Sequence, residues 1–339
     1  MGPGPDEEAA VLTAAQAALE NRERVVLAVS GGLDSMVLLD AVASVASKRS
    51  GILVATFDHR TGSHATMAAK LVEKRSAALG LRCVVGIATV RGTRESEWRD
   101  ERWRFLRSTA KSFRAPVVTA HTQNDQLETV FMRILRDAGA RGLAGLYAES
   151  DIVRPFINLR REQLEAYAVS RHIRFVDDPS NQSRSHLRNR VRHELLPAIT
   201  RVRPRFPRDL LTIAQMAAAW REEMAEAVEQ IAPVVDSDGS VRVARSALAG
   251  YAEESLRALW PSIVAVGGFV MDRRGTHRLA EFTMKGHTGG SIQLSGGVEV
   301  RMSRDQLVVR RWDAHRVEMI RSARLVPGRT RPQSRAPLA

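Results

Sequence analysis

A short glycine-rich segment follows the first apolar run of the chain. Residues 24–29 are mostly apolar and β-branched, and the next six residues are Ser30, Gly31, Gly32, Leu33, Asp34 and Ser35. From Ser35 onward apolar residues recur at helical spacing, so the segment joins a strand to a helix. Adjacent glycines let the backbone bring its N–H groups close to a ligand, and the serines add hydroxyl donors. Because a helix N-terminus also carries partial positive charge, we predict that these six residues bind the phosphates of ATP.

Asp34 is the one acidic residue of this segment. A carboxylate repels bare phosphate, so we expect Asp34 to bind the Mg²⁺ that accompanies ATP and to act in catalysis. The Walker pattern, which needs a lysine after its glycines, is absent. A glycine pair in an ordinary strand-to-helix turn is the plain alternative, and the complete six-residue pattern disfavours it. The segment resembles the PP-loop of the N-type ATP pyrophosphatases, which cleave ATP to AMP and pyrophosphate while they adenylate a substrate.

Polar residues also follow two later apolar runs. Asp58 and His59 come directly after residues 52–57, where the PP-loop superfamily recognises adenine. His121 follows residues 116–119. All three are assigned to the ATP site as predictions. The alternatives are ordinary strand-end polar residues and, for His121, a histidine that is simply satisfied at the end of its strand.

Two carboxylates, Asp125 and Glu128, share one face near the start of the helix that begins at about Gln123. Acidic residues are common there because they complement the helix dipole. Beside an ATP site, however, a pair of carboxylates would hold the ammonium group of a second substrate by charge-assisted hydrogen bonds. The spacing therefore predicts a site for an amine.

Positive charge dominates the composition. The chain has 51 basic and 38 acidic residues, a net charge of +13, and an excess of this size favours a polyanionic partner such as nucleic acid. Residues 182–208 contain eight arginines and a single acid, and two further arginines lie three apart on one helical face. Solvated cationic helices are the alternative. We predict an RNA-binding surface that includes Arg99, Arg102, Arg188, Asn189 and Arg201.

The segments combine into a more specific resemblance. His121-xxx-Asp125-Gln-x-Glu128-Thr, Asp178-Pro-Ser-Asn and Arg188-Asn-xx-Arg192, together with the loop, resemble the bacterial tRNA(Ile)-lysidine synthetases over about residues 22–205. The resemblance implies ligation of free L-lysine to C2 of the wobble cytidine in the CAU anticodon of tRNA(Ile), through an adenylated cytidine. It also implies lysine binding by Asp125 and Glu128. Arg188 and Arg192 would be catalytic and offset charge that develops on phosphate or cytidine.

This sequence departs from the pattern of that family at four positions. Thr122 and Asn124 stand where many members have His and Asp, Trp103 replaces Tyr, and Asp137 replaces Gly. The alternatives to a lysidine synthetase are another PP-loop tRNA-modifying adenylase and a catalytically inactive nucleotide-binding RNA adaptor. A tRNA thiolase needs paired cysteines, and Cys83 is the only cysteine.

These residues need a scaffold that brings strand ends together. Apolar runs at 24–29, 52–57, 83–88 and 116–119 alternate with helical stretches at 63–79, 95–113 and from about 123. Strands that are apolar throughout predict a doubly wound α/β fold with a parallel sheet, whose ligands bind outside the carboxyl ends of the strands. This adenine nucleotide alpha hydrolase-like PP-loop domain is expected over residues 1–208.

The pattern changes in the later part of the chain. Helical stretches are expected at 161–172, at 184–196 up to Pro197, and at 209–231, and short strands at 291–294, 298–302 and 306–311. We predict a smaller, mostly helical and mixed domain over residues 209–326, made of a linker helix and a tRNA-docking part. The Pro- and Arg-rich tail, residues 327–339, is expected to be disordered.

The sequence also argues against a membrane protein, a secreted protein and a protein that depends on cysteine pairs. No apolar run approaches the roughly 20 residues of a membrane helix, and the N-terminus lacks the features of a secretory signal. A single cysteine forms no intrachain disulfide and no cysteine-based metal site. We therefore expect a cytoplasmic protein without a membrane association. A homodimer is one oligomeric state that the sequence allows.

Overall fold

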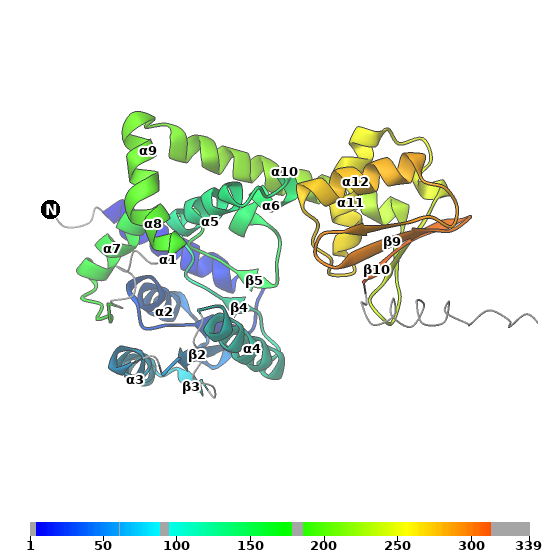
Figure 1. The fold of residues 1–339 in the computed structure, drawn as a ribbon. Coiled ribbons are helices and arrows are strands. Elements are labelled where there is room, and N and C mark those ends of the chain that lie inside the picture. Colours follow the sequence, from blue (N-terminus) through cyan, green and yellow to red (C-terminus); the bar gives the residue numbers. More distant parts are fainter. Residues whose placement is uncertain (1–4, 61, 89–94, 178–185, 313–339) are drawn as a thin grey trace, which may run out of the picture. The chain divides into compact units, whose positions relative to one another are not determined.

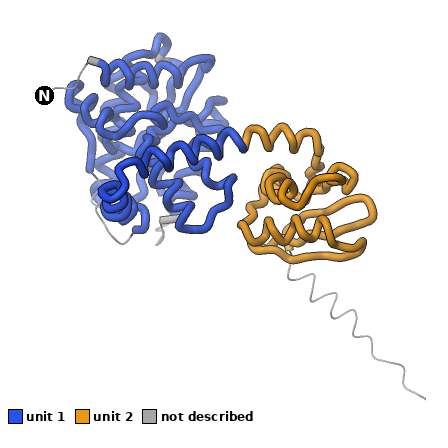
Figure 2. The backbone as a smooth tube through the Cα atoms, turned by 90° about the horizontal axis from the view of Figure 1, so that it is seen from above, with its two compact units in different colours: residues 1–220 blue, residues 221–339 orange. Residues whose placement is uncertain are grey.

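The computed structural model describes residues 5–60, 62–88, 95–177 and 186–312. Contacts between residues divide the chain into two compact units, Met1–Trp220 and Arg221–Ala339 (Figure 2). The division falls inside the long helix α10 (Phe206–Ile231), whereas the sequence places the boundary after residue 208, in the first turn of the same helix.

The first unit is built on a parallel five-stranded sheet with the order β3-β2-β1-β4-β5. Its strands are β1 (Val25–Ala28), β2 (Ile52–Asp58), β3 (Arg82–Ile87), β4 (Val117–Val118) and β5 (Ile152–Val153). The chain runs outward from β1 to β3 and then returns to the other side of β1. Between β1 and β4 the strand order therefore reverses, and the loops after these two strands diverge to leave a crevice.

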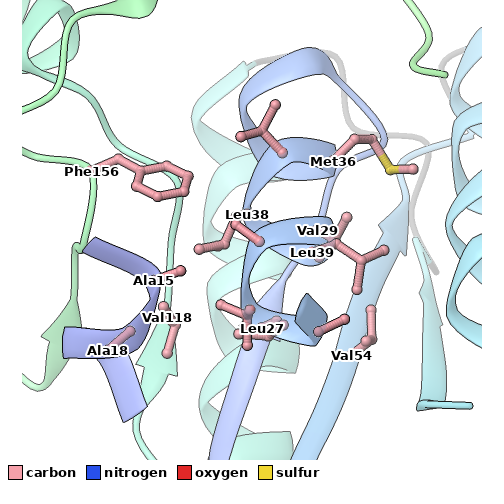
Figure 3. Packing of buried hydrophobic residues seen from close by; sticks show 14 of the residues in the cluster. Ala15, Ala18, Leu27, Val29, Met36, Leu38, Leu39, Val54, Val118 and Phe156 are labelled. Carbon is pink, nitrogen blue, oxygen red and sulfur yellow. The ribbon is translucent and has the colours of Figure 1, made fainter. Parts of the chain in front are cut away.

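Helices cover both faces of this sheet (Figure 1). Successive residues of β1 point to opposite faces, so Val25 and Leu27 belong to one apolar cluster and Val26 to another. The first cluster joins the sheet to α1 (Pro5–Leu19), α2 (Leu33–Val45), α3 (Ser63–Ala78) and α7 (Arg161–Ser170), and Figure 3 shows part of its packing. The second cluster joins it to α4 (Glu95–Phe113).

A third cluster is formed by helical segments that come after β4 in the chain. Its residues belong mainly to α5 (Gln123–Leu135), α6 (Ala140–Leu143), the π-helical turn Val191–Leu195, α9 (Leu196–Val202) and the start of α10. The short helix α8 (Leu187–Arg190) leads into the π-helical turn. Val130 and Phe131 of α5 pack with Val191 and with Leu210 of α10. Pro197 lies in the first turn of α9, where a missing N–H costs nothing, so the helical stretch continues beyond the proline at which we expected it to stop.

The described part of the second unit contains an antiparallel sheet, the end of α10 and two further helices. The strand order is β6-β7-β10-β9-β8, with β6 (Val234–Val235), β7 (Val241–Ala244), β8 (Ser291–Leu294), β9 (Val298–Met302) and β10 (Gln306–Arg311). Helices α11 (Glu253–Ala265) and α12 (Arg273–Lys285) pack against it around the fully buried Trp260. Short 3-10 turns lie at Arg49–Gly51, Gly145–Tyr147 and Ser246–Leu248.

The predicted fold class is confirmed, with a parallel α/β unit followed by a smaller mixed unit. The three strands expected after residue 290 have the predicted bounds. The sequence analysis did not anticipate α1, β5, β6 or β7. The predicted disordered tail lies outside the described residues. Within the part of the chain that the structure describes, no helix is long and apolar enough to cross a membrane.

Candidate nucleotide site

A cavity of about 430 Å³ lies where the strands β1, β2 and β4 end. The wall that follows β1 includes Ser30, Gly32, Leu33, Asp34 and Ser35. The other walls carry His59 after β2, Trp103 and Arg102 from α4, His121 after β4, and Asp125, Arg161 and Arg192 from the later helices. The structure thus places most of the predicted ATP residues around one hollow at the carboxyl edge of the sheet.

The glycine-rich loop is braced by its own serines. The backbone N–H of Ser30 donates to Oγ of Ser35 (3.1 Å), and that hydroxyl donates to the carbonyl of Gly32 (2.9 Å). No side chain caps the start of α2, whose N-cap residue is Gly32. Since the first N–H groups of a helix have no intrahelical acceptor, they are available to anionic oxygens in the cavity.

Gly31 lets the loop pass close to α3. Its φ is +88°, and a Cβ added there would lie 2.8 Å from Cβ of Ala68, closer than two carbon atoms can approach. Its carbonyl accepts a hydrogen bond from the N–H of Val176 (2.9 Å), which joins the loop to the segment after α7. The glycine is therefore required by the backbone conformation and by the packing of α3.

Replacing Gly31 by Ala is expected to lower the free energy of unfolding by about 1–3 kcal/mol, because the new methyl group meets Ala68 and the left-handed φ is strained. Denaturant unfolding of both proteins measures the difference. Gly32→Ala is a matched control, since its φ is −79° and its added Cβ would approach nothing closer than 3.7 Å. Equal losses in the two variants would contradict the argument.

Asp34 lies on the first turn of α2 with its carboxylate facing the cavity. Burial raises the pKa of Asp34 to about 6, although the nearby Arg161 opposes this shift. The Arg161 guanidinium lies 3.7 Å from Oδ2, whereas Oδ1 is buried and has no hydrogen-bond partner. An unpartnered carboxylate oxygen of this kind can accept a cation. Among the described residues no group of three or more His, Cys, Asp or Glu side chains could hold a metal alone.

The strand-end residues have different surroundings. Asp58 is buried, and its two oxygens accept hydrogen bonds from the N–H of Arg60 and the hydroxyl of Thr66, both at 2.8 Å. This carboxylate therefore fixes the connection from β2 to α3 and is not part of the cavity lining, whereas His59 is. The contact between Asp58 and ATP stays a prediction.

His121 lines the cavity, and its Nδ1 lies 2.8 Å from the hydroxyl of Thr119. Burial lowers the pKa of His121 to about 4, so the imidazole is neutral at neutral pH. It can offer a ligand a hydrogen bond but no positive charge. Its contact with ATP stays a prediction, since His121 contacts Thr119, the residue after β4, and also lines the cavity.

Asp125 belongs to the capping box that begins α5. Its Oδ2 accepts hydrogen bonds from the N–H of Thr122 (2.9 Å) and from the Thr122 hydroxyl (3.0 Å). Oδ1 has only longer contacts, 3.5 Å to Arg192 and 4.0 Å to Arg188. Thr122, one of the unusual residues of this chain, therefore fixes the Asp125 side chain on the cavity wall.

Glu128 is almost completely buried, with 3% of its side chain exposed. Its carboxylate accepts hydrogen bonds from Nε of Arg188 (3.0 Å) and from Nη2 of Arg192 (3.1 Å), and Nε of Arg192 also donates to it. Glu128 is absent from the cavity lining. In this structure it holds two arginines, and its predicted contact with lysine remains a prediction.

Asn124 connects two elements. Its Oδ1 accepts the backbone N–H of Arg161 (3.0 Å), the first residue of α7, and the neighbouring Gln123 N–H donates to the carbonyl of Leu159 (2.9 Å). The Asn124 amide is therefore used to fix α7 against α5. This is a role that asparagine and aspartate oxygens can both perform.

The residues predicted to bind RNA do not form one cluster. Arg102 lines the cavity, and its buried Nε has no hydrogen-bond partner, whereas Arg99 is exposed on the same helix. Arg188 contacts Glu128, and Arg201 is exposed on α9. Asn189 is half-buried on α8. The motif at residues 178–181 lies outside the described residues.

The residues of the cavity wall that the sequence did not reveal include two basic side chains, Arg161 and His64. Arg161 is one of many arginines, and only its position at the first turn of a helix distinguishes it. His64 lies in the first turn of α3, the helix that follows β2. Neither carries a motif that points to the cavity.

The first part of this chain is similar in sequence to known proteins. The family model of the PP-loop domain matches residues 6–199. The tRNA(Ile)-lysidine synthase of Thermosipho africanus is 31% identical over 58% of this chain and 48% of its own length. The corresponding synthase of Geobacter sulfurreducens is 34% identical over 61% of this chain and 47% of its own length. The chain thus spans about half the length of these curated relatives.

A solved structure shows the same fold. The U34-tRNA thiolase NcsA of Methanococcus maripaludis, solved with its iron–sulfur cluster, superposes with a TM-score of 0.52 and 13% identity over 63% of this chain and 79% of its own. At this identity the similarity concerns the fold alone. Because the family match covers more than half of the residues and includes the loop, the sheet and the cavity wall, the chain belongs to the PP-loop domain family.

Proposed function

We propose that this protein is an ATP-dependent carbon–nitrogen ligase that attaches free L-lysine to C2 of the wobble cytidine in the CAU anticodon of tRNA(Ile). The observation that carries the proposal is a single cavity whose walls combine the PP-loop with Asp125 and Arg192. The loop suits a nucleotide, the carboxylate suits an amine, and the guanidinium suits a phosphate. Similarity to tRNA(Ile)-lysidine synthases supports this substrate set.

ATP would lie with its phosphates against the loop and the uncapped first turn of α2. Asp34 would hold Mg²⁺ together with the phosphates of ATP, because its Oδ1 has no hydrogen-bond partner and no group of three or more His, Cys, Asp or Glu side chains among the described residues could hold a metal by itself. The protein ligands of Mg²⁺ at such sites are commonly one or two carboxylates, and the substrate phosphates are its other ligands. The ion offsets the charge of these phosphates. The neutral His121 would donate or accept a hydrogen bond in the same hollow.

Asp125 would bind the ammonium group of lysine through Oδ1, the oxygen with only long contacts. Arg192 lies on the same wall and would offset the charge that develops when the cytidine oxygen displaces pyrophosphate and when lysine displaces AMP. Glu128 would keep Arg188 and Arg192 oriented, since its carboxylate accepts hydrogen bonds from both.

The first unit carries most of the excess positive charge. Residues 1–220 contain 33 basic and 24 acidic residues, and residues 221–339 contain 18 basic and 14 acidic residues. The arginine-rich stretch that follows the cavity wall would therefore supply much of the attraction for the tRNA backbone. A tRNA substrate would place the enzyme in the cytoplasm.

The test uses radiolabelled lysine, Mg-ATP and a tRNA(Ile) transcript with a CAU anticodon. Acid-precipitable label is the expected result, and a transcript with uridine in place of the wobble cytidine should remain unlabelled. Folded protein that binds ATP but transfers no lysine would overturn the proposal. Release of pyrophosphate without label would indicate another tRNA-modifying adenylase, and binding without pyrophosphate release would indicate an inactive adaptor.

A further inference from the structure

Arg161 lies at the first turn of α7 and reaches the PP-loop side of the cavity. Its Nη1 is 3.7 Å from Oδ2 of Asp34, and the residue also lines a second hollow of about 580 Å³ that shares Leu33 and Asp177 with the first. The guanidinium therefore lies on the wall between the two hollows, beside the loop that would hold the phosphates.

Arg161 has weaker ion pairs than the catalytic candidate on the same wall. Its second partner is Glu165, one turn further along α7, at 3.3 Å and with half of its side chain exposed. Arg192, by contrast, donates to the buried Glu128 through two of its nitrogens. An exposed pair and a 3.7 Å contact contribute little free energy, so the Arg161 side chain can turn toward a stronger anion at small cost.

The backbone of Arg161 is fixed although its side chain is not. Oδ1 of Asn124 accepts the Arg161 N–H, and the carbonyl of Leu159 accepts the N–H of Gln123. These two hydrogen bonds tie the start of α7 to the start of α5 at the cavity edge. A long side chain on a fixed backbone atom can reach a phosphate without any movement of the sheet or the loop.

We propose that Arg161 binds the β- and γ-phosphates of ATP, the part of the nucleotide that leaves as pyrophosphate. The inference rests on the proposed use of ATP and adds a ligand that no sequence motif indicates. A planar guanidinium with several donors suits a pyrophosphate group, and it offsets the negative charge that the leaving group gains. In this proposal Arg161 contacts neither the α-phosphate nor the adenosine.

The test compares the affinities of ATP, AMP and inorganic pyrophosphate for the wild type and for Arg161→Gln, by calorimetry without Mg²⁺. Loss of a charge-assisted hydrogen bond should weaken the binding of ATP and pyrophosphate by about tenfold or more. The affinity for AMP should stay within about twofold of the wild-type value. Arg160→Gln removes the same charge from the exposed neighbouring residue and should change none of the three. Equal weakening of AMP and ATP, or no weakening, would overturn the proposal.

A second comparison excludes an indirect effect through Asp34, whose charge Arg161 partly neutralises. In an Asp34→Asn background, Arg161→Gln should still weaken ATP by about tenfold, because the contact with phosphate persists. If the effect disappears in that background, Arg161 is only the counter-ion of Asp34 and the proposal fails. A wild type that binds no ATP would instead contradict the proposed function itself.

Discussion

Asp34→Asn is expected to reduce lysidine formation by at least about a thousandfold while the variant remains folded. Asp34 lines the cavity, one of its carboxylate oxygens has no hydrogen-bond partner, and its charge is what a cation on the phosphates requires. Asparagine keeps the shape but loses the charge, so the stabilisation of the developing negative charge on phosphate is lost. Single-turnover transfer of radiolabelled lysine to tRNA measures the loss.

The stability of the same variant should change in the opposite direction. Burial raises the pKa of Asp34 from 3.8 to about 6. Above pH 6 the carboxylate is therefore charged in both states, and the charged form costs more free energy in the folded protein than in the unfolded chain. That group therefore lowers the free energy of unfolding at neutral pH, and the penalty disappears as the pH falls from 6 to below 4. We expect Asp34→Asn to raise Tm at pH 7.5 and to match the wild type near pH 3.5.

Asp40 provides a matched control on the same helix. Its carboxylate is also buried, but Arg75 contacts Oδ1 at 2.5 Å and the Tyr167 hydroxyl donates to Oδ2 at 3.1 Å. Asp40→Asn should therefore lower Tm, because it leaves Arg75 without its partner, and the folded fraction should retain lysine transfer. A lower Tm for Asp34→Asn than for Asp40→Asn would contradict this account of the two carboxylates.

Much of the fold could be predicted because its signals are local. Strands such as Ile52–Asp58 are apolar throughout since helices cover both faces of a parallel sheet, and that property is visible in a few consecutive residues. The three strands after residue 290 are short runs of consecutive residues and were equally visible, and in Gln306–Arg311 half-buried and buried positions alternate along most of the strand. Short strands such as Ile152–Val153 could not be recognised, because two residues hold no periodicity.

The chemistry of the site was only partly predictable, because partners are set by the tertiary fold. The sequence shows that Asp58, Asp125 and Glu128 are acidic and lie near strand ends or a helix start. It does not show that Asp58 bonds to the turn that follows it, or that Glu128 meets arginines some sixty residues later in the chain. Of the three, only Asp125 lines the cavity.

Glu128→Gln is expected to lower the free energy of unfolding by about 3 kcal/mol. The change keeps the volume of the side chain and removes the charge that Arg188 and Arg192 share. The two guanidiniums then have only the longer contacts with Asp125, at 4.0 and 3.5 Å, to offset their charge. Chemical denaturation of both proteins measures the loss. Glu165→Gln is the matched control, because its pair with Arg161 is half exposed and should be worth less than about 1 kcal/mol.

The kinetics of the same residues separate a positioning role from lysine binding. Asp125→Asn should raise KM for lysine, since its Oδ1 is the oxygen on the cavity wall that we propose accepts the ammonium group. Glu128→Gln should instead lower kcat, because we propose that the arginines it orients offset the developing charge. Adding Arg188→Gln to Glu128→Gln should restore part of the lost stability, because it removes one unpaired cation, but not kcat. If Glu128→Gln raises KM for lysine with kcat and stability unchanged, Glu128 binds lysine directly and the arginines do not depend on it.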